Sequence, residues 1–368
     1  MELETVADNK AFQKKANISL VMQTIRVNKQ ISRIDISREL GLDRSTITNI
    51  VSKLIEGELL VELAEGSSVS KGGRKPVLLG LNRDFGTVLG LEIQINLYRA
   101  TLMNIDGSII WNRSGNIGSS LNLYEIVSSI YTELKTYLDR NNSPLLGIGI
   151  GLPGHIDPEN NTILASSPFF KESGYVEDFS KLFDFPVVLD NDANCCAWGV
   201  LEDRKEDSIK NFLYSILEFH GDREAESKLE IGFGIVINGD VYYGSNFAAG
   251  ELGDDLVEDS HLIRDYNTFF TKLIKKLTQF ISFLNPSHLF LGGEFINHQE
   301  LITDIVGKSS INNKCEVLFS NRREFDVSFG AASMFIERLF KIPGLDNQRV
   351  TKLTWENILS LRSEKRGR

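Results

Sequence analysis

The sequence LLGIGIGLPG, at residues 145–154, is a short apolar run that ends in a turn rich in glycine and proline. An apolar run of this length, bounded by turn residues, is typical of a buried strand, so we predict a strand over Leu145–Gly151. A second apolar run, Val187–Leu189, leads into the polar stretch Asp190–Asn194. Ligands of α/β sheets bind where strands end, so both polar turns are predicted to border a binding cleft.

Strands and helices alternate on both sides of this stretch, in two rounds. The first round has predicted strands at 88–93, 98–104 and 108–112, and an amphipathic helix at 123–140. The second has strands at 211–217, 231–237, 241–243 and 289–291, and helices at about 266–284 and 330–339. Two such rounds predict an α/β body of two related lobes that face a cleft.

The first eighty residues follow a different pattern. The predicted elements are helices at 17–27, 33–40 and 44–56, strands at 58–63 and 77–82, and a loop at 64–76. Ser32 and Asp43 are predicted to cap the second and third helices, and Gly41 to end the second. Two helices joined by a tight turn, followed by a hairpin with a basic tip, predict a winged helix-turn-helix.

A recognition helix enters the major groove at its N-terminal end, so its early side chains must be short or able to read bases. The predicted DNA-binding residues are Arg44, Ser45, Thr46, Thr48, Asn49, Lys53, Lys71, Arg74 and Lys75. The first six belong to the third helix and the last three to the hairpin loop. Alternatively, the three helices are a docking or dimerisation module and the basic loop is a linker.

The charge of the chain is unevenly distributed. All 368 residues carry 40 Lys+Arg and 50 Asp+Glu, a net charge of −10, which by itself argues against a nucleic-acid partner. Residues 1–80, however, hold 12 basic and 10 acidic residues, which leaves a net charge of −12 on the rest. We therefore expect the N-terminal module alone to contact DNA, with an affinity that falls steeply as salt rises.

Composition restricts the remaining classes. The hydrophobic fraction of 42% and the charged fraction of 24% are ordinary for globular proteins. No apolar run is long enough to span a bilayer, and the N-terminus lacks the apolar segment of a signal peptide, so a cytoplasmic protein without membrane association is expected. Three cysteines, at positions 195, 196 and 315, are too few for a disulfide framework or a four-thiolate metal site.

Several short motifs occur in one order along the chain. They are GRKP at 73–76, GIGLPG at 149–154, NDAN at 191–194, INGDVYYG at 237–244, AAGELG at 248–253 and NPSHLFLGG at 285–293. Together with the winged helix, this order resembles the ROK family of repressors, open reading frames and kinases, in particular its xylose- and N-acetylglucosamine-type repressors. The resemblance covers about residues 15–340. It implies a two-lobed actin/hexokinase-like (ribonuclease H-like) α/β body with a sugar site between the lobes.

The resemblance assigns sugar-binding roles residue by residue. Asp192 matches the catalytic base of the kinases, and Asn191 and Glu251 match neighbouring sugar contacts. Gly154 lets the chain pass close to the ligand, and Asp254 stands where many members have a histidine. Alternatively, Asp190–Asn194 is a polar turn that caps a helix.

The same resemblance predicts that the chain is not an enzyme. Kinase members place Asp-x-Gly-Gly-Thr where this chain has Glu92–Asn96, and Gln94 and Ile95 put side chains where phosphate needs bare backbone. Glu230 stands in the second phosphate loop and would repel a triphosphate. The zinc motif of the family is missing, since no cysteine lies between 196 and 315. No catalytic residue, cofactor or metal is therefore predicted, and Cys195 and Cys196 are expected to be small buried residues.

The sequence thus predicts a sugar-responsive transcriptional repressor. The predicted domains are a winged helix-turn-helix (1–82), a first α/β lobe (83–195), a second α/β lobe (196–345), and a C-terminal helix with a basic tail (346–368). The expected partners are a double-stranded operator with an inverted repeat, a sugar effector, and further copies of the chain in a homodimer or homotetramer. Two alternatives stay open: a sugar kinase with an accessory DNA-binding domain, and a DNA-binding regulator that has lost sugar binding.

Overall fold

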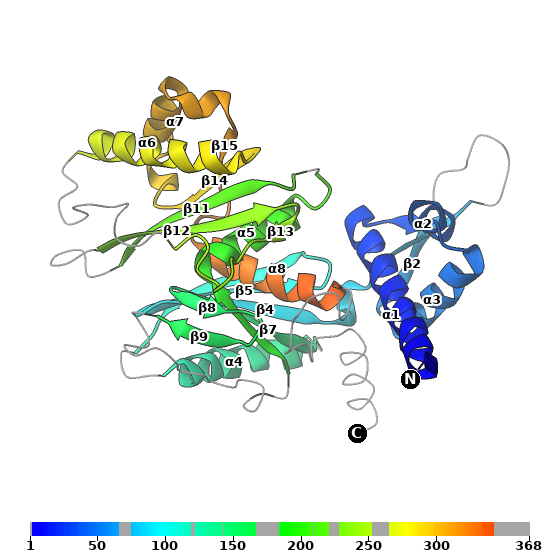
Figure 1. Cartoon of the computed structure of the whole chain (residues 1–368). Helices are drawn as coiled ribbons and strands as arrows, with labels where there is room; N and C mark the ends of the chain where they lie inside the picture. The colour runs from blue at the N-terminus through cyan, green and yellow to red at the C-terminus, as the bar shows by residue number, and fades with distance from the viewer. Residues whose placement is uncertain are drawn as a thin grey trace.

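The structure is a computed structural model, and it describes residues 2–65, 75–118, 122–141, 143–166, 183, 185–207, 209–220, 228–251 and 265–341. Lys71, Arg74, Asp254 and the predicted C-terminal helix lie outside these residues. Figure 1 shows a small N-terminal unit beside a larger body that contains two sheets. Among the described helices, none has the length and apolar character required to cross a membrane.

The N-terminal unit combines three helices with a three-stranded antiparallel sheet of order β1-β3-β2. Its elements are α1 (Glu2–Asn28), β1 (Ile31–Ser32), α2 (Arg33–Leu40), α3 (Arg44–Glu56), β2 (Leu60–Glu65) and β3 (Val77–Leu81). The apolar faces of the three helices meet over the sheet, where Ile25, Ile36 and Ile47 are fully buried. The predicted hairpin strands are present as β2 and β3, but β1 was not predicted, and the three-stranded sheet makes this unit mixed α and β and not all-α.

The helix ends in this unit test the predicted caps. The Ser32 hydroxyl accepts the backbone N–H of Asp35 at 3.2 Å, and Gly41 ends α2 with a φ of 65°, so both predictions are confirmed. Asp43 stands at the N-cap of α3, as predicted, but its exposed carboxylate accepts no hydrogen bond from the first turn of the helix. The first helix was predicted at 17–27, but α1 begins earlier, at Glu2.

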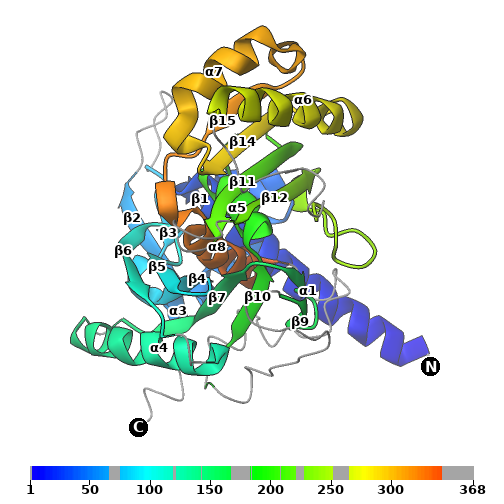
Figure 2. The same ribbon diagram turned by 90° about the vertical axis from the view of Figure 1, so that its left-hand side faces the viewer.

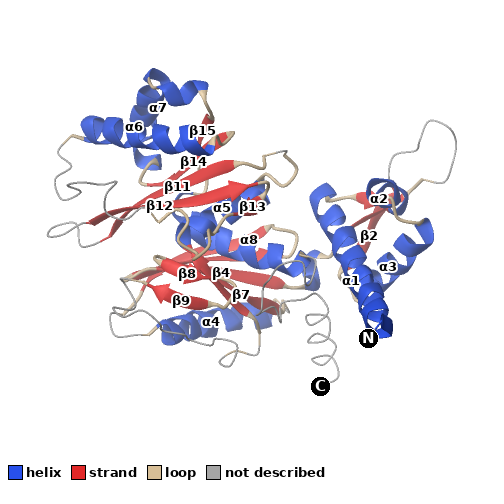
Figure 3. Cartoon of the chain, in the orientation of Figure 1, coloured by secondary structure: helices blue, strands red, loops and turns tan. Residues whose placement is uncertain are grey.

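The first lobe is a five-stranded sheet of order β10-β7-β4-β5-β6, in which β10, β7 and β4 run parallel. Its strands are β4 (Thr87–Ile93), β5 (Leu97–Asn104), β6 (Ile109–Asn116), β7 (Leu145–Leu152) and β10 (Val187–Asn191). The helix α4 (Leu123–Arg140) covers the outer face (Figure 3). A small hairpin of β8 (His155–Asp157) and β9 (Thr162–Ala165) follows β7. The predicted elements of this lobe are confirmed, with ends shifted by a few residues.

The second lobe repeats this plan with a five-stranded sheet of order β13-β12-β11-β14-β15. Its strands are β11 (Phe212–His220), β12 (Lys228–Ile237), β13 (Asp240–Val241), β14 (His288–Gly293) and β15 (Glu316–Phe319). The helices α6 (Tyr266–Leu284) and α7 (Gln299–Lys308) cover its outer face (Figure 3). Short 3-10 helices are η1 (Arg83–Phe85), η5 (Ile296–His298), η6 (Ser310–Asn313) and η7 (Arg323–Phe325).

Two helices, α5 (Asp192–Asp203) and α8 (Asp326–Phe340), lie between the two sheets (Figure 2). They touch at backbone distance, since a Cβ on Gly330 would stand 1.7 Å from the carbonyl oxygen of Cys195. The strand β7 supports this layer because isoleucine and glycine alternate along it. Ile148 and Ile150 point into the core under α4, whereas a Cβ on Gly149 would stand 2.0 Å from the carbonyl oxygen of Ala331 in α8. The glycines thus let α8 rest directly on the sheet.

This packing predicts that Gly330→Ala is severely destabilising. Because the new methyl group would meet the backbone of α5, the helices must separate, which costs about 3 kcal/mol or more of unfolding free energy. The matched control is Gly307→Ala in α7, where the new Cβ would have no described neighbour within 4 Å apart from its own turn of the helix. There the alanine should leave stability unchanged or raise it by about 1 kcal/mol. Urea titrations of both variants measure this difference, and equal midpoints would refute the close contact.

Candidate functional site

The predicted site residues meet where two parallel strands end. The register pairs Asn191 at the end of β10 with Leu152 at the end of β7, which brings the turn after β7 beside the start of α5. Gly154 has a φ of 115°, and a Cβ there would lie 2.4 Å from the carbonyl oxygen of Ala165. Only glycine fits this position, so the turn needs it for backbone geometry.

Asn191 organises the site with its whole side chain. Its Oδ1 accepts the backbone N–H groups of Ala193 at 2.9 Å and Asn194 at 3.2 Å, which caps α5. Its Nδ2 donates to the carbonyl oxygen of Gly154 at 2.9 Å and to Oε1 of Glu251 at 3.1 Å. Asn191 therefore caps a helix, as the alternative interpretation of Asp190–Asn194 predicted, and it also lies beside other predicted site residues. Asn191 fixes the positions of Gly154 and Glu251.

Asp192 is the buried carboxyl group of the cluster. Its Oδ1 accepts the backbone N–H of Ala193 at 2.7 Å. Burial raises the pKa of this carboxyl well above its usual range, and the neighbouring carboxylates of Glu218 and Glu251 raise it further. A protonated carboxyl can donate a hydrogen bond as well as accept one, which suits a hydroxyl-rich ligand.

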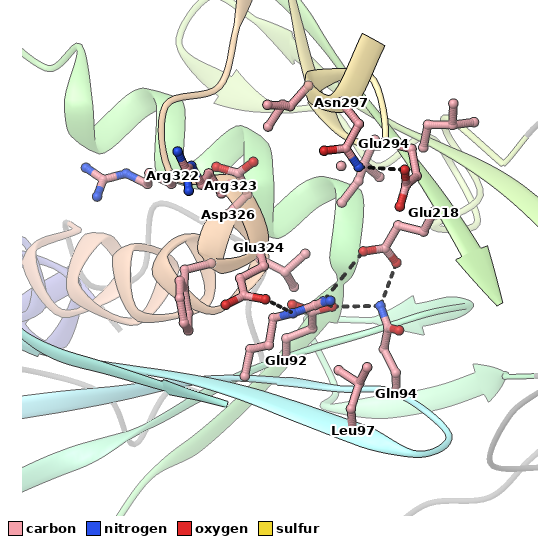
Figure 4. A pocket seen from close by; sticks show the side chains of 17 residues that line it. Glu92, Gln94, Leu97, Glu218, Glu294, Asn297, Arg322, Arg323, Glu324 and Asp326 are labelled. Atoms are coloured by element: carbon pink, nitrogen blue, oxygen red, sulfur yellow. Dashed lines mark hydrogen bonds and ion pairs between the residues drawn. The ribbon is translucent and has the colours of Figure 1, made fainter. Parts of the chain in front are cut away.

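A polar network joins the two lobes beside Asp192 (Figure 4). Glu92 at the end of β4 accepts hydrogen bonds from Arg99 at 2.6 Å and from Gln94 at 2.7 Å. The Gln94 amide also donates to Oε2 of Glu218, on β11 of the other lobe, at 2.6 Å. Burial raises the pKa of the Glu92 carboxyl, and the nearby Glu218 raises it further. The second carboxyl oxygen of Glu92, Oε2, has no hydrogen-bond partner among the described residues.

This network forms one wall of a cleft of about 880 Å³ between the lobes. The lining residues are Glu92, Gln94, Leu97, Arg99, Ile216, Leu217, Glu218, Gly293, Glu294, Ile296, Asn297, Arg322, Arg323, Glu324, Phe325, Asp326 and Val327. Figure 4 shows that Gln94 and Glu92 point toward Glu218 across this space. The segment Glu92–Asn96 therefore brings side chains, and not bare backbone amides, to the cleft.

Beneath the cluster lies a buried group that the sequence reasoning missed. Asp190 is fully buried and accepts hydrogen bonds from Tyr243 at 2.6 Å and from Trp198 at 3.3 Å. Arg338 of α8 lies 3.9 Å from the same carboxylate and is itself buried. The sequence contained one signal, because an arginine in the mostly apolar segment 326–340 favours a buried ionic partner.

In the N-terminal unit, α3 turns its apolar residues inward and its polar residues outward. Ile47, Ile50, Val51 and Leu54 are buried. The exposed residues include Arg44, Ser45, Thr48, Asn49 and Lys53, whereas Thr46 is half-buried. Lys75, the part of the predicted basic loop that the structure describes, is also exposed. The predicted DNA-binding residues that the structure describes are therefore accessible to a partner, except for the half-buried Thr46.

All three cysteines are buried free thiols. Cys195 and Cys196 are buried at the start of α5, and burial raises the pKa of both thiols well above the usual range. They are therefore poor nucleophiles, as expected of small packing residues. In the part of the chain that the structure describes, no three His, Cys, Asp or Glu residues are placed to hold a metal ion.

Comparison with known proteins relates this geometry to one family. The ROK family matches residues 89–267. A xylose repressor from Staphylococcus xylosus is 32% identical over 253 residues, which cover 66% of this chain and 61% of that protein. A xylose repressor from Bacillus subtilis strain 168 is 27% identical over 266 residues, which cover 71% of this chain and 64% of that protein. The chain spans about three fifths of the length of the relatives it matches.

A solved structure has the same fold. A ROK family transcriptional regulator, described as a homologue of the E. coli MLC protein, superposes with a TM-score of 0.66 at 18% identity. The match covers 88% of this chain and 96% of the other. The fold is therefore the mixed α/β fold of ROK proteins.

The crowded carboxyl groups predict a specific pH dependence. Because the folded-state pKa values of Glu92 and Asp192 are raised, folding takes up protons, and the unfolding free energy falls as pH rises through those values. Glu218→Gln removes a repelling charge from both groups, so its stability gain over wild type should be larger at pH 8 than at pH 5. Glu300→Gln, at an exposed position of α7, is the control and should show no such difference. Thermal unfolding at both pH values measures this, and a larger gain at pH 5 would contradict it.

Proposed function

We propose, given the ROK-family domain at residues 89–267, that this chain is a sugar-responsive transcriptional repressor that binds DNA through its N-terminal unit. The observation that carries the proposal is the exposed polar face of α3, which is presented on the same chain as the clustered site at the start of α5. A DNA-binding surface and a ligand site on one chain are the two sites that a ligand-controlled repressor needs.

The N-terminal unit has the parts of a winged helix-turn-helix. The helix α2 is joined to α3 by the short turn at Gly41–Asp43, and the hairpin of β2 and β3 supplies the wing. In this proposal α3 enters the major groove, with Arg44 and Asn49 toward the base edges. Lys75 and the loop before it reach phosphates or the minor groove. Residues 1–82 would form this domain.

The body would consist of the lobes 83–195 and 196–345. The proposed boundary at residue 195 lies inside α5, and α8 from the second half of the chain packs on the first sheet. The lobes are thus interlocked through the two central helices, and closure of the cleft moves these helices with it. Two copies of the chain would place two α3 helices on an inverted repeat.

The effector would bind at Asp192, with Glu251 and Asn191 as neighbours and Gly154 and Asp254 completing the site. Since the matched relatives are named xylose repressors, D-xylose is the first effector to test. The charge of the site favours a sugar without phosphate. Carboxyl groups of Glu92, Glu218 and Glu230 surround Asp192, and the nearby Arg99 already pairs with Glu92. A phosphate group would be repelled there.

Phosphoryl transfer is not proposed, although one glucokinase is 34% identical to this chain over 118 residues. A kinase aims backbone amides and a metal at the phosphates of ATP. Here the network of Glu92, Gln94 and Glu218 fills the matching position with side chains of the wrong charge. A coupled ADP-release assay with D-xylose and D-glucose distinguishes the two functions, because steady turnover would establish a kinase.

The DNA-binding assignment predicts a large effect of Arg44→Ala. Loss of one base- or phosphate-reading arginine typically costs about 1–3 kcal/mol, so affinity for the operator should fall by about tenfold. The probe is a DNA duplex enriched by the wild-type chain from a random library. Arg140→Ala, which removes an exposed arginine at the end of α4, is the matched control and should bind as wild type does. If Arg44→Ala binds equally well, α3 is not the recognition helix.

The effector assignment predicts binding of D-xylose and exclusion of D-xylose 5-phosphate. At 100 times its dissociation constant a ligand stabilises the folded state by about 2.7 kcal/mol, which a thermal-shift measurement detects. Asp192→Asn should lose the shift, whereas Glu300→Gln should keep it. A shift with the phosphate but not with the free sugar would overturn the charge argument. No shift with xylose or a panel of other pentoses, hexoses and N-acetylhexosamines would favour a regulator that has lost sugar binding.

A further inference from the structure

We infer that α8 couples the candidate sugar site to the DNA-binding unit through two adjacent residues, Glu337 and Arg338, which act as positioning residues. Glu337 holds Arg26 of α1, and Arg338 lies against Asp190 under the sugar site. This inference rests on the proposed function, because it concerns how the two proposed sites communicate. Its evidence is a separate set of buried contacts.

At the DNA-binding end, Arg26 is inserted into the body. Its side chain is 6% exposed, its Nη1 donates to Glu337 of α8 at 2.5 Å, and its Nη2 donates to Glu202 near the end of α5. Lys205 pairs with Glu202 at 2.5 Å from the other side. The Nε of Arg26 has no partner among the described residues. A buried charge held by two helices cannot leave without exposing unpaired partners.

Further contacts fix α1 to the end of the same helix. The side chains of Gln23 and Ser19 donate hydrogen bonds to the carbonyl oxygens of Phe340 at 2.9 Å and Lys341 at 3.3 Å. The last carbonyls of a helix have no partner within the helix, so α1 supplies the donors that α8 lacks at its C-terminus. The N-terminal unit is thus attached to the end of α8 by hydrogen bonds to backbone carbonyls as well as by the ion pair of Arg26 with Glu337.

At the sugar end, Arg338 lies next to Glu337 in the chain but faces the site. Its Nη1 donates to the carbonyl oxygen of Pro158 at 3.2 Å, and its Nη2 lies 3.9 Å from Asp190. Asp190 in turn accepts the backbone N–H of Asn191 at 2.8 Å, one residue before Asp192. A displacement of the strand end at Asn191 therefore acts directly on Arg338 and on α8.

The helix α5 provides a parallel connection. It begins at Asp192 in the site and carries Glu202 near its end, about 15 Å away along a helix of this pitch. Since α5 and α8 meet at backbone distance at Gly330, they move as one rigid pair. The helix α5 thus contacts the site at its start and Arg26 near its end, whereas α8 contacts Asp190 and Arg26 through the adjacent residues Arg338 and Glu337 near its C-terminus.

The interface also has room to rearrange. A cavity of about 470 Å³ lies beside Arg26 and is lined by residues of the N-terminal unit and of the body, including Lys29, Arg83, Asp106, Glu202 and Lys205. An exposed ion pair, Lys29 with Glu206, crosses the same interface at 2.5 Å with side chains 67% and 54% exposed. Solvated pairs contribute little, so this pair offers a control in the same place.

The test measures hydrogen exchange of the full chain by mass spectrometry, with and without D-xylose. In wild type, xylose should change exchange both in peptides covering residues 187–199 and in peptides covering residues 16–28 of α1, by about threefold or more. In Glu337→Gln the change at 187–199 should persist and the change in α1 should be clearly smaller, because Arg26 then keeps only its pair with Glu202 of α5. Lys29→Gln should behave as wild type. Xylose-dependent change at 187–199 without any change in α1 of wild type would overturn the inference.

A second arm needs no sugar. Arg338→Met removes the contact with Asp190 and should alter exchange at residues 16–28 of the free chain by about threefold or more. In the double variant with Glu337→Gln, the Met substitution should cause a smaller additional change in α1, because the ion pair between α8 and Arg26 is already lost. Unchanged α1 exchange in Arg338→Met overturns the coupling whatever xylose does. Absence of any xylose effect in wild type counts against the proposed effector alone, and this arm then decides the coupling.

Discussion

The contact between α5 and α8 is the constraint on which the rest of the structure depends. The two helices touch at backbone distance through Gly330, and α8 rests on the first sheet through Gly149. Helices this close leave no room for side chains, and interiors packed at this density transmit displacement instead of absorbing it. The Gly-Ile alternation at residues 145–154 follows from the same need, since the isoleucines fill the core under α4 and the glycines face α8.

Several buried charged side chains belong to α5 and α8 or pair with residues of these two helices. Asp190 and Arg338 pair under the candidate site, and Glu202 and Glu337 hold Arg26 of the N-terminal unit. Buried ion pairs contribute little net stability compared with apolar packing, but they are strongly directional and costly to break singly. They therefore specify how the N-terminal unit sits on the body. Such specification is what the proposed function requires, because a ligand can change DNA affinity only if the N-terminal unit has a defined position on the body.

Features that depend on neighbouring residues could be predicted from the sequence, whereas contacts between distant residues could not. Ser32 and Gly41 marked the ends of α2, and the apolar period of residues 123–140 marked α4, because caps and periodicity act within one helix. The pairing of Asp190 with Arg338 joins residues 148 positions apart, and no local pattern encodes it. The two-residue strand β1 is too short to show alternation. Asn191 was identified as a site residue, but its role as the cap that holds Gly154 and Glu251 depends on the parallel register of β7 and β10.

The most direct measurement is the affinity of the full chain for its enriched DNA duplex, by fluorescence anisotropy at fixed salt, with and without saturating D-xylose. The proposed function and the coupling through α8 predict that xylose weakens binding by about tenfold, within the range of typical allosteric coupling. Equal affinities in the presence and absence of bound xylose would contradict the account, because a sugar that binds without changing DNA affinity cannot regulate the repressor.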